Sequence, residues 1–179
     1  MDFLATDVDC CVLEGGGQMF RNCLALAALE QRSVRLFNIR HNRPKPGLSN
    51  QHLVVAQLIN SLTGGVVIGA ELQSTVLKYR PGIITSKCSS TITVDVGSAG
   101  AISLLSQAVL PCLLFLDTVT GQMKGDCSSD SIQLIFSGGT NVPFSPPIDH
   151  VQHVLLPILK QMGLQARLDI ERRGFYPIG

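Results

Sequence analysis

The sequence predicts an α/β (α+β) fold made of two repeated units of the βαβαββ type, each a small sheet with two helices on one face. Segments with the two-residue period of strands alternate along the chain with segments of helical period. The order of elements in residues 1–90 begins again in residues 91–179, which defines two units with those bounds. Since right-handed crossovers bring successive helices to the same side of a sheet, both helices of a unit should share one face.

The elements of the first unit follow from apolar periodicity and from the residues that end them. Its expected elements are strands at 5–13, 33–39, 66–71 and 75–79 and helices at 20–28 and 50–63. Ser49 suits the N-cap of the second helix, and Gly64 suits its C-cap. The proline-rich segment 43–47 is predicted to be a loop because it cannot be helical.

The second unit is expected to repeat this order. Its predicted elements are strands at 91–96, 132–137 and 165–172 and helices at 101–110, extended past Pro111 with a kink, and at 148–162. Pro147 suits the first turn of the last helix, and Gly163 suits its C-cap. Residues 118–131 hold several serines and a Lys-Gly-Asp turn, so we expect a surface loop there.

The composition indicates a compact globular chain. Apolar residues make up 45% and charged residues 15%, and the mean hydropathy is +0.30.

The stretch between Asp95 and Asp117 carries no charge, but serines and Pro111 interrupt it. We therefore interpret it as a buried helix and expect no membrane span. The six cysteines lack the spacing of a zinc site, which favours a reduced intracellular compartment.

Four predicted strand-to-helix turns carry residues that suit ligand binding. These turns are 14–18, 40–51, 97–100 and 138–147. In crossover units such turns meet at the carboxyl edge of the strands, where open α/β sheets bind ligands. The sequence therefore predicts a site along this edge.

Glycines and bases indicate that the ligand is an anion. Three glycines at 15–17 precede a helix, whose free N–H groups can face a phosphate. Their pattern matches neither the P-loop nor the dinucleotide fingerprint, and a tight turn needed only for packing is the alternative. Nearby bases that suit phosphate oxygens are Arg21, Arg40, Arg43 and Lys45. Arg32 and Arg35, beside a helix end and a strand start, are interpreted as solvated.

Several polar side chains have two interpretations each. Glu14 could bind Mg²⁺ beside the phosphates of a nucleotide, or it could pair with Arg21. Gln107 is the single amide on an apolar helix and needs a buried partner, either backbone or a ligand. His150 and His153 are interpreted as surface histidines, because no third metal ligand lies near them in sequence.

Five sets of residues closely resemble motifs of the RNA 3′-terminal phosphate cyclase family. They are EGGGQ at 14–18, NIRHNRPKPGLSNQHL at 38–53, GAE at 69–71, GGT with PPID at 138–140 and 146–149, and RGFYP at 173–177. The resemblance spans nearly the whole chain. It implies a ligase-type enzyme of RNA processing that adenylylates its own histidine with ATP and passes AMP to an RNA 3′-phosphate. The neighbouring 2′-hydroxyl then displaces AMP and leaves a 2′,3′-cyclic phosphate.

The resemblance also implies ligands and their residues. The implied site residues are Glu14 for a metal ion, Mg²⁺ or Mn²⁺, Gln51, Gln107 and Pro146 for ATP, and Arg21, Arg40 and Arg43 for phosphates, including the RNA end. The expected partners are ATP and RNA 3′-phosphate ends. The expected location is intracellular, in the nucleoplasm more than in the cytoplasm.

The family's nucleophilic histidine lies in a later segment, together with an insert and a third repeat that this sequence lacks. None of His41, His52, His150 and His153 occupies its place, so no catalytic residue is assigned. The alternatives to an enzyme are a fragment that binds RNA or nucleotide without turnover and a truncated chain. A cyclase-like scaffold of ribosome assembly is a further alternative, but that family lacks the EGGGQ and RPKPGL-x-x-QHL motifs.

Overall fold

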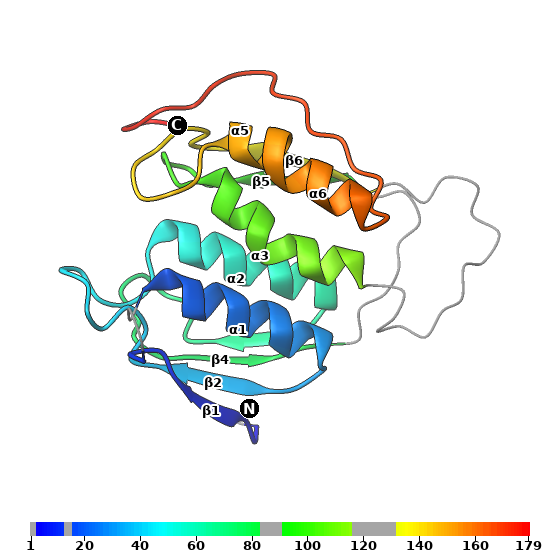
Figure 1. The fold of residues 1–179 in the computed structure, drawn as a ribbon. Helices are drawn as coiled ribbons and strands as arrows, with labels where there is room; N and C mark the ends of the chain where they lie inside the picture. Colours follow the sequence, from blue (N-terminus) through cyan, green and yellow to red (C-terminus); the bar gives the residue numbers. More distant parts are fainter. Residues whose placement is uncertain (1–2, 13–15, 83–90, 116–131) are drawn as a thin grey trace.

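The computed structural model describes residues 3–12, 16–82, 91–115 and 132–179 (Figure 1). Residues 1–90, the predicted first unit, contain β1 (Thr6–Asp9), α1 (Gly17–Leu29), β2 (Val34–Phe37), α2 (Asn50–Thr63), β3 (Val66–Ile68) and β4 (Leu77–Arg80). The second unit contains β5 (Thr91–Asp95), α3 (Ile102–Leu114), β6 (Gln133–Ser137), α5 (Ile148–His150), the π-helical segment η1 (Val151–Leu155) and α6 (Leu156–Gln161). The predicted mixture of small sheets and helices is confirmed.

The first unit forms a four-stranded sheet in the order β1-β2-β4-β3. β1 and β2 are parallel, with Thr6 opposite Val34, whereas β4 runs antiparallel to both of its neighbours. α1 and α2 cover one face of this sheet (Figure 1). The order βαβαββ is therefore observed in this unit, and its two helices share one face.

The second unit contains only a parallel pair of strands, β5 and β6, among the residues that the structure describes. The strand predicted at 165–172 is wrong, because none of these residues is in a strand. Leu168 and Ile170 are half-buried and pack against the core, so their alternation reflects burial and not backbone pairing. A complete second βαβαββ unit is therefore not confirmed.

The core lies where α1, α2 and α3 pack against one another, between the four-stranded sheet and the β5-β6 pair (Figure 1). Its buried side chains include Phe20 and Leu24 of α1, Leu36 of β2, Ile59 of α2 and Leu105 of α3. α3 continues past Pro111 and is the buried helix expected from the charge-free stretch. Within the described ranges, no helix combines the length and the apolar character that a membrane span requires.

The residues expected to end helices lie where predicted. Ser49 is the N-cap residue of α2, and Gly64 ends that helix in the left-handed region at φ +62°, a conformation that is easy for glycine. The helix predicted at 148–162 is observed as α5, η1 and α6, and Gly163 follows it at φ +101°. The expected surface loop at 118–131 lies outside the described residues.

Candidate anion-binding site

The described residues of the turns expected to carry the site lie along one edge of the molecule, beyond the carboxyl ends of β1, β2, β5 and β6 (Figure 1). Oε1 of Gln51 accepts a hydrogen bond from the backbone N–H of Ala101 at 3.1 Å, which joins the start of α2 to the start of α3. The N–H of Gly139 donates to the carbonyl oxygen of Gly100 at 2.9 Å. The second, third and fourth predicted turns are therefore held together by hydrogen bonds.

Three side chains approach the first residues of α1 closely. A Cβ atom on Gly17 would overlap Nε2 of His52 and would lie 3.0 Å from Nη1 of Arg21. A Cβ atom on Gly16 would lie 3.0 Å from Nη2 of Arg43. Glycine at both positions lets these polar groups reach the backbone. We call the set of Gly16, Gly17, Arg21, Arg43 and His52 the anion cradle.

The start of α1 offers hydrogen-bond donors to the anion cradle. The helix begins without a side-chain cap and has no acidic residue in its first turn. Its first N–H groups have no acceptor within the helix, and the helix dipole adds partial positive charge at this end. A helix start of this kind suits an anion.

Arginine side chains add positive charge to the same region. Within the described ranges, none of Arg21, Arg40 and Arg43 forms an ion pair with a carboxylate. Burial lowers the pKa of Arg21, and burial together with the charge of Arg43 lowers the pKa of Arg40. Guanidinium groups nevertheless remain charged in proteins, so the cluster concentrates positive charge. Nη1 of Arg40 donates to the carbonyl of Gly47 at 2.7 Å, so part of this side chain fixes its own loop.

His52 belongs to the anion cradle although sequence reasoning assigned it no role there. Its side chain is 7% exposed and its Nδ1 lies 2.6 Å from Oγ of Ser49, whereas its Nε2 has no hydrogen-bond partner in the part of the chain that the structure describes. Burial, followed by the charges of Arg40 and Arg21, lowers the pKa of His52 to about 3, so the ring is neutral at physiological pH. The sequence feature that could have indicated this role is the position of His52 one turn after Ser49, the N-cap residue of α2.

The residues expected to contact a nucleotide lie further along the edge. Pro146 is half-buried, and its carbonyl oxygen accepts a hydrogen bond from Oγ of Ser103 in α3 at 2.6 Å. Gln107 lies one turn later on α3, but its side chain is exposed, so the expectation of a buried partner is wrong. Position 107 is the exposed residue among buried neighbours in this part of α3. Sequence periodicity could not locate an exposed position in so uniformly apolar a helix. Glu14 lies outside the described residues.

The motifs at 138–149 and 173–177 contact each other. Both Nη atoms of Arg173 donate to the carboxylate of Asp149, at 2.5 and 2.7 Å. Oγ1 of Thr140 donates to the carbonyl oxygen of Gly174 at 3.0 Å and accepts a hydrogen bond from the N–H of Gly174 at 3.1 Å. These contacts fasten the last residues of the chain to the turn that carries Pro146.

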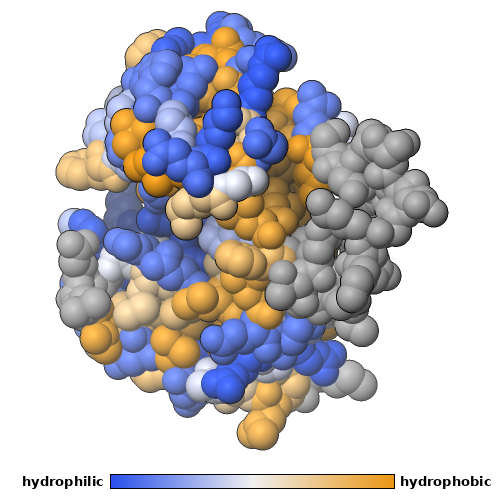
Figure 2. Space-filling model, turned by 45° about the vertical axis from the view of Figure 1, so that its right-hand side comes forward, coloured by the Kyte–Doolittle hydropathy of each residue, from blue (hydrophilic) through white to orange (hydrophobic). Residues whose placement is uncertain are grey.

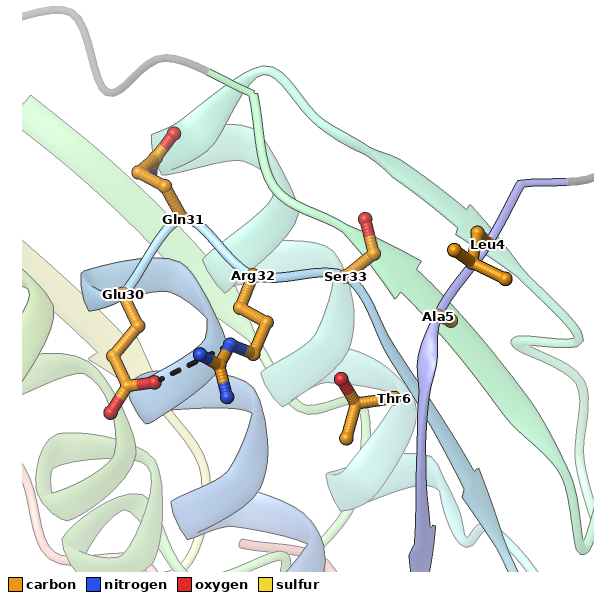
Figure 3. A pocket seen from close by; sticks show the side chains of 7 residues that line it. All are labelled: Leu4, Ala5, Thr6, Glu30, Gln31, Arg32 and Ser33. Atoms are coloured by element: carbon orange, nitrogen blue, oxygen red, sulfur yellow. Dashed lines mark ion pairs between the residues drawn. The ribbon is translucent and has the colours of Figure 1, made fainter.

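A shallow depression of about 490 Å³ lies away from the anion cradle, where β1 and β2 begin and α1 ends (Figure 3). Its lining residues are Leu4, Ala5, Thr6, Glu30, Gln31, Arg32 and Ser33. Within it Arg32 pairs with Glu30 at 3.9 Å, and both side chains are exposed. Arg35 forms a partly exposed pair with Asp7 at 3.3 Å. The interpretation of Arg32 and Arg35 as solvated bases is consistent with these positions.

The histidines of the second unit do not form a metal site. His150 and His153 are both exposed, as the sequence predicted. In the described part of the chain, no group of three or more His, Cys, Asp or Glu residues is arranged to hold a metal ion. A metal ion would therefore need ligands from other residues or from a bound nucleotide.

Known proteins resemble the chain over almost its whole length. A family model described as RNA 3′-terminal phosphate cyclase matches residues 12–179. The RNA 3′-terminal phosphate cyclase of Desulfurococcus amylolyticus is 41% identical over 97% of this chain and 44% of its own length. The protein of that name from Drosophila melanogaster is 40% identical over the same shares. A probable RNA 3′-terminal phosphate cyclase of Dictyostelium discoideum is 38% identical over 96% of this chain and 37% of its own length. The chain thus spans less than half of these relatives.

Proposed function

Because the chain belongs to the RNA 3′-terminal phosphate cyclase family, we propose that its anion cradle binds phosphate groups of ATP and of an RNA 3′ end. In the whole protein this binding would serve the ATP-dependent conversion of an RNA 3′-phosphate to a 2′,3′-cyclic phosphate. The observation that carries the proposal is the approach of Arg21, Arg43 and His52 to an uncapped helix start. Donors from a helix terminus and from guanidinium forks match the several oxygens of a phosphate.

The residues of this chain would contribute binding and orientation. Arg21 and Arg43 would hold phosphate oxygens at the start of α1, and Arg40 would add charge while fixing its loop. Gln51, Gln107 and Pro146 would contact the nucleotide further along the edge, with Pro146 beside the adenine. Electrostatic positioning of this kind is a large part of what phosphoryl and nucleotidyl transfer require of a protein.

A divalent cation, Mg²⁺ or Mn²⁺, would neutralise phosphate charge next to the anion cradle. Glu14, which lies outside the described residues, is the proposed protein ligand, and nucleotide oxygens would complete the coordination. The covalent step needs a nucleophilic histidine, which the family carries in a later segment. A nucleoplasmic location of the whole protein stays a prediction from the resemblance.

Equilibrium binding of ATP and of a 3′-phosphorylated oligoribonucleotide to the 179-residue chain tests this function. We expect Arg43→Ala to weaken binding by about tenfold or more and to reduce the salt dependence by about one counterion per lost phosphate contact. Arg40→Ala should weaken binding as well. Arg32→Ala is the matched control, because it removes an exposed arginine at the opposite end of the molecule. An equal loss in Arg32→Ala and Arg43→Ala would contradict a localised site.

Binding without turnover is the second candidate function. The covalent step needs a nucleophilic histidine, and none of the described histidines has that role. His41, His150 and His153 are exposed outside the anion cradle, and His52 is buried and neutral. A chain extended through the family's later segment separates the two candidates. Formation of a covalent AMP adduct from labelled ATP would support the enzyme, and its absence in a folded extended chain would support binding alone.

A further inference from the structure

The Nε2 atom of His52 is a buried polar atom that finds no hydrogen-bond partner among the described residues. A buried donor or acceptor without a partner destabilises the folded chain, because it has lost its hydrogen bonds to water. Such atoms are rare in folded proteins, and a bound ligand is one way to satisfy them. The side chain is more than nine-tenths buried, at 7% exposure, so bulk solvent does not reach it freely.

The other ring nitrogen of His52 indicates which hydrogen the ring carries. Nδ1 lies 2.6 Å from Oγ of Ser49 and 3.4 Å from the backbone nitrogen of Ser49. A backbone N–H can only donate, so Nδ1 is the acceptor in this pair. In a neutral imidazole with an acceptor at Nδ1, the proton resides on Nε2. The N-cap contact of α2 therefore makes Nε2–H a hydrogen-bond donor.

This donor is directed at the start of α1. A Cβ atom on Gly17 would collide with Nε2, and the same position lies 3.0 Å from Nη1 of Arg21. Nη2 of Arg43 reaches the neighbouring Gly16. The groups that meet here are N–H donors from a neutral ring, from two guanidinium groups and from a helix start. A set made only of donors suits an anion that has several oxygens.

We propose that the Nε2–H group of His52 donates a hydrogen bond to a phosphate oxygen bound in the anion cradle, and that Ser49 is a positioning residue that fixes the required tautomer. The inference rests on the proposed phosphate site and adds a neutral donor to its cationic ones. A neutral donor does not gain or lose charge near physiological pH. The phosphate contact made by His52 is therefore constant across the range in which an ordinary histidine titrates.

Nitrogen NMR of the ¹⁵N-histidine-labelled 179-residue chain tests the tautomer and the contact without any substitution. One histidine should be protonated on Nε2 and should not titrate between pH 5 and pH 8, and addition of inorganic tripolyphosphate should shift its Nε2 resonance. Assignment uses the loss of that signal in His52→Asn. A His52 signal protonated on Nδ1, or an Nε2 resonance unaffected by saturating tripolyphosphate, would overturn the proposal.

A pair of variants measures what the donor contributes to binding. In His52→Gln the amide NH₂ can replace the Nε2–H donor, whereas in His52→Asn the shorter side chain cannot reach it. We expect tripolyphosphate to bind His52→Asn about tenfold more weakly than the wild type, and His52→Gln to recover most of this loss. Thermal unfolding of each variant confirms that it is folded.

The outcome for His52 can be separated from the outcome for the anion cradle as a whole. If Arg43→Ala loses tripolyphosphate binding and His52→Asn binds like the wild type, the phosphate site stands and the role of His52 is wrong. If the wild-type chain binds no tripolyphosphate, the proposed function and the role of His52 both fail.

Discussion

The two units of the chain differ in the size of their sheets and in the burial of their last helices. In the first unit a four-stranded sheet covers α1 and α2, and each of these helices has at least five buried residues. In the described part of the second unit only β5 and β6 are paired. α3, which packs against α1 and α2, is largely buried, whereas α6 has no buried residue. Helix burial therefore follows position in the fold, because the helices that pack against one another between the two sheets are buried and α6 is not.

The charged groups of the proposed site follow this division, whereas the exposed apolar side chains do not. The three arginines and His52 of the proposed site all belong to the first unit, and the second unit supplies the neighbouring backbone and Pro146. Exposed apolar side chains occur on both units, including Leu26 of the first unit and Ile158 and Met162 of the second. Figure 2 shows apolar residues gathered in a band between the more polar upper and lower parts of one face. Because α6 has no buried residue, we expect truncations in α6 to cost less stability than truncations in the core of the first unit.

Two side-chain truncations, one in each unit, should show the largest difference in the free energy of unfolding. Leu36→Ala removes a side chain of β2 that is 0% exposed and should lower the free energy of unfolding by about 2–5 kcal/mol. Ile158→Ala, at a position that is 50% exposed, should change it by less than about 1 kcal/mol. Urea unfolding of both variants measures the two effects. Equal losses would show that α6 is buried against a partner in solution.

The buried His52 should make the first unit sensitive to acid. Its pKa is lowered to about 3 in the folded chain from 6.5 for an ordinary histidine, so between these values the unfolded chain binds a proton that the folded chain does not. Stability is therefore fully present above pH 6.5 and falls below it, by up to about 1.4 kcal/mol per pH unit. Urea unfolding at pH 7, 6 and 5 should show a steeper fall for the wild type than for His52→Gln. Identical slopes would mean that His52 is protonated in the folded chain.

Loss of the contact between Asp149 and Arg173 should destabilise the fold less, and only within the second unit. The hydrogen bonds from Arg173 hold the pKa of Asp149 below its ordinary value. The contact therefore stabilises the fold above about pH 4 and is lost as the pH falls further. Hydrogen exchange at pH 7 should be faster at the amide of Gly174 in Asp149→Asn, with little change in α2. Unchanged exchange at Gly174 would show that this contact does not hold the last residues.

Much of the first unit could be predicted because local signals and tertiary packing agree there. The N-cap Ser49 and the C-cap Gly64 set the ends of α2 through short-range hydrogen bonds and backbone conformation, which sequence reports directly. The convergence of the turns could also be predicted, since crossover topology places them at one edge. The strand expected at 165–172 could not be judged from sequence, because alternating burial does not reveal whether a neighbouring strand is available.

The site itself was only partly predictable. Glycines and arginines are recognisable as phosphate-binding types, so Arg21, one turn into α1, and Arg43, in the loop after β2, could be named from the sequence. The role of His52 depends on how closely the start of α1 approaches α2, which leaves Nε2 unpaired and excludes a side chain at Gly17. No local pattern encodes that distance. Gln107 was misjudged for a related reason, because the exposed strip of α3 depends on which helices pack against it.

The position of a bound phosphate group tests the central claim most directly. A crystal structure of the chain with tripolyphosphate should show a phosphate at the first N–H groups of α1, within hydrogen-bond distance of Arg21, Arg43 and Nε2 of His52. A phosphate bound instead beside Arg32, with the start of α1 free of anion, would contradict the account.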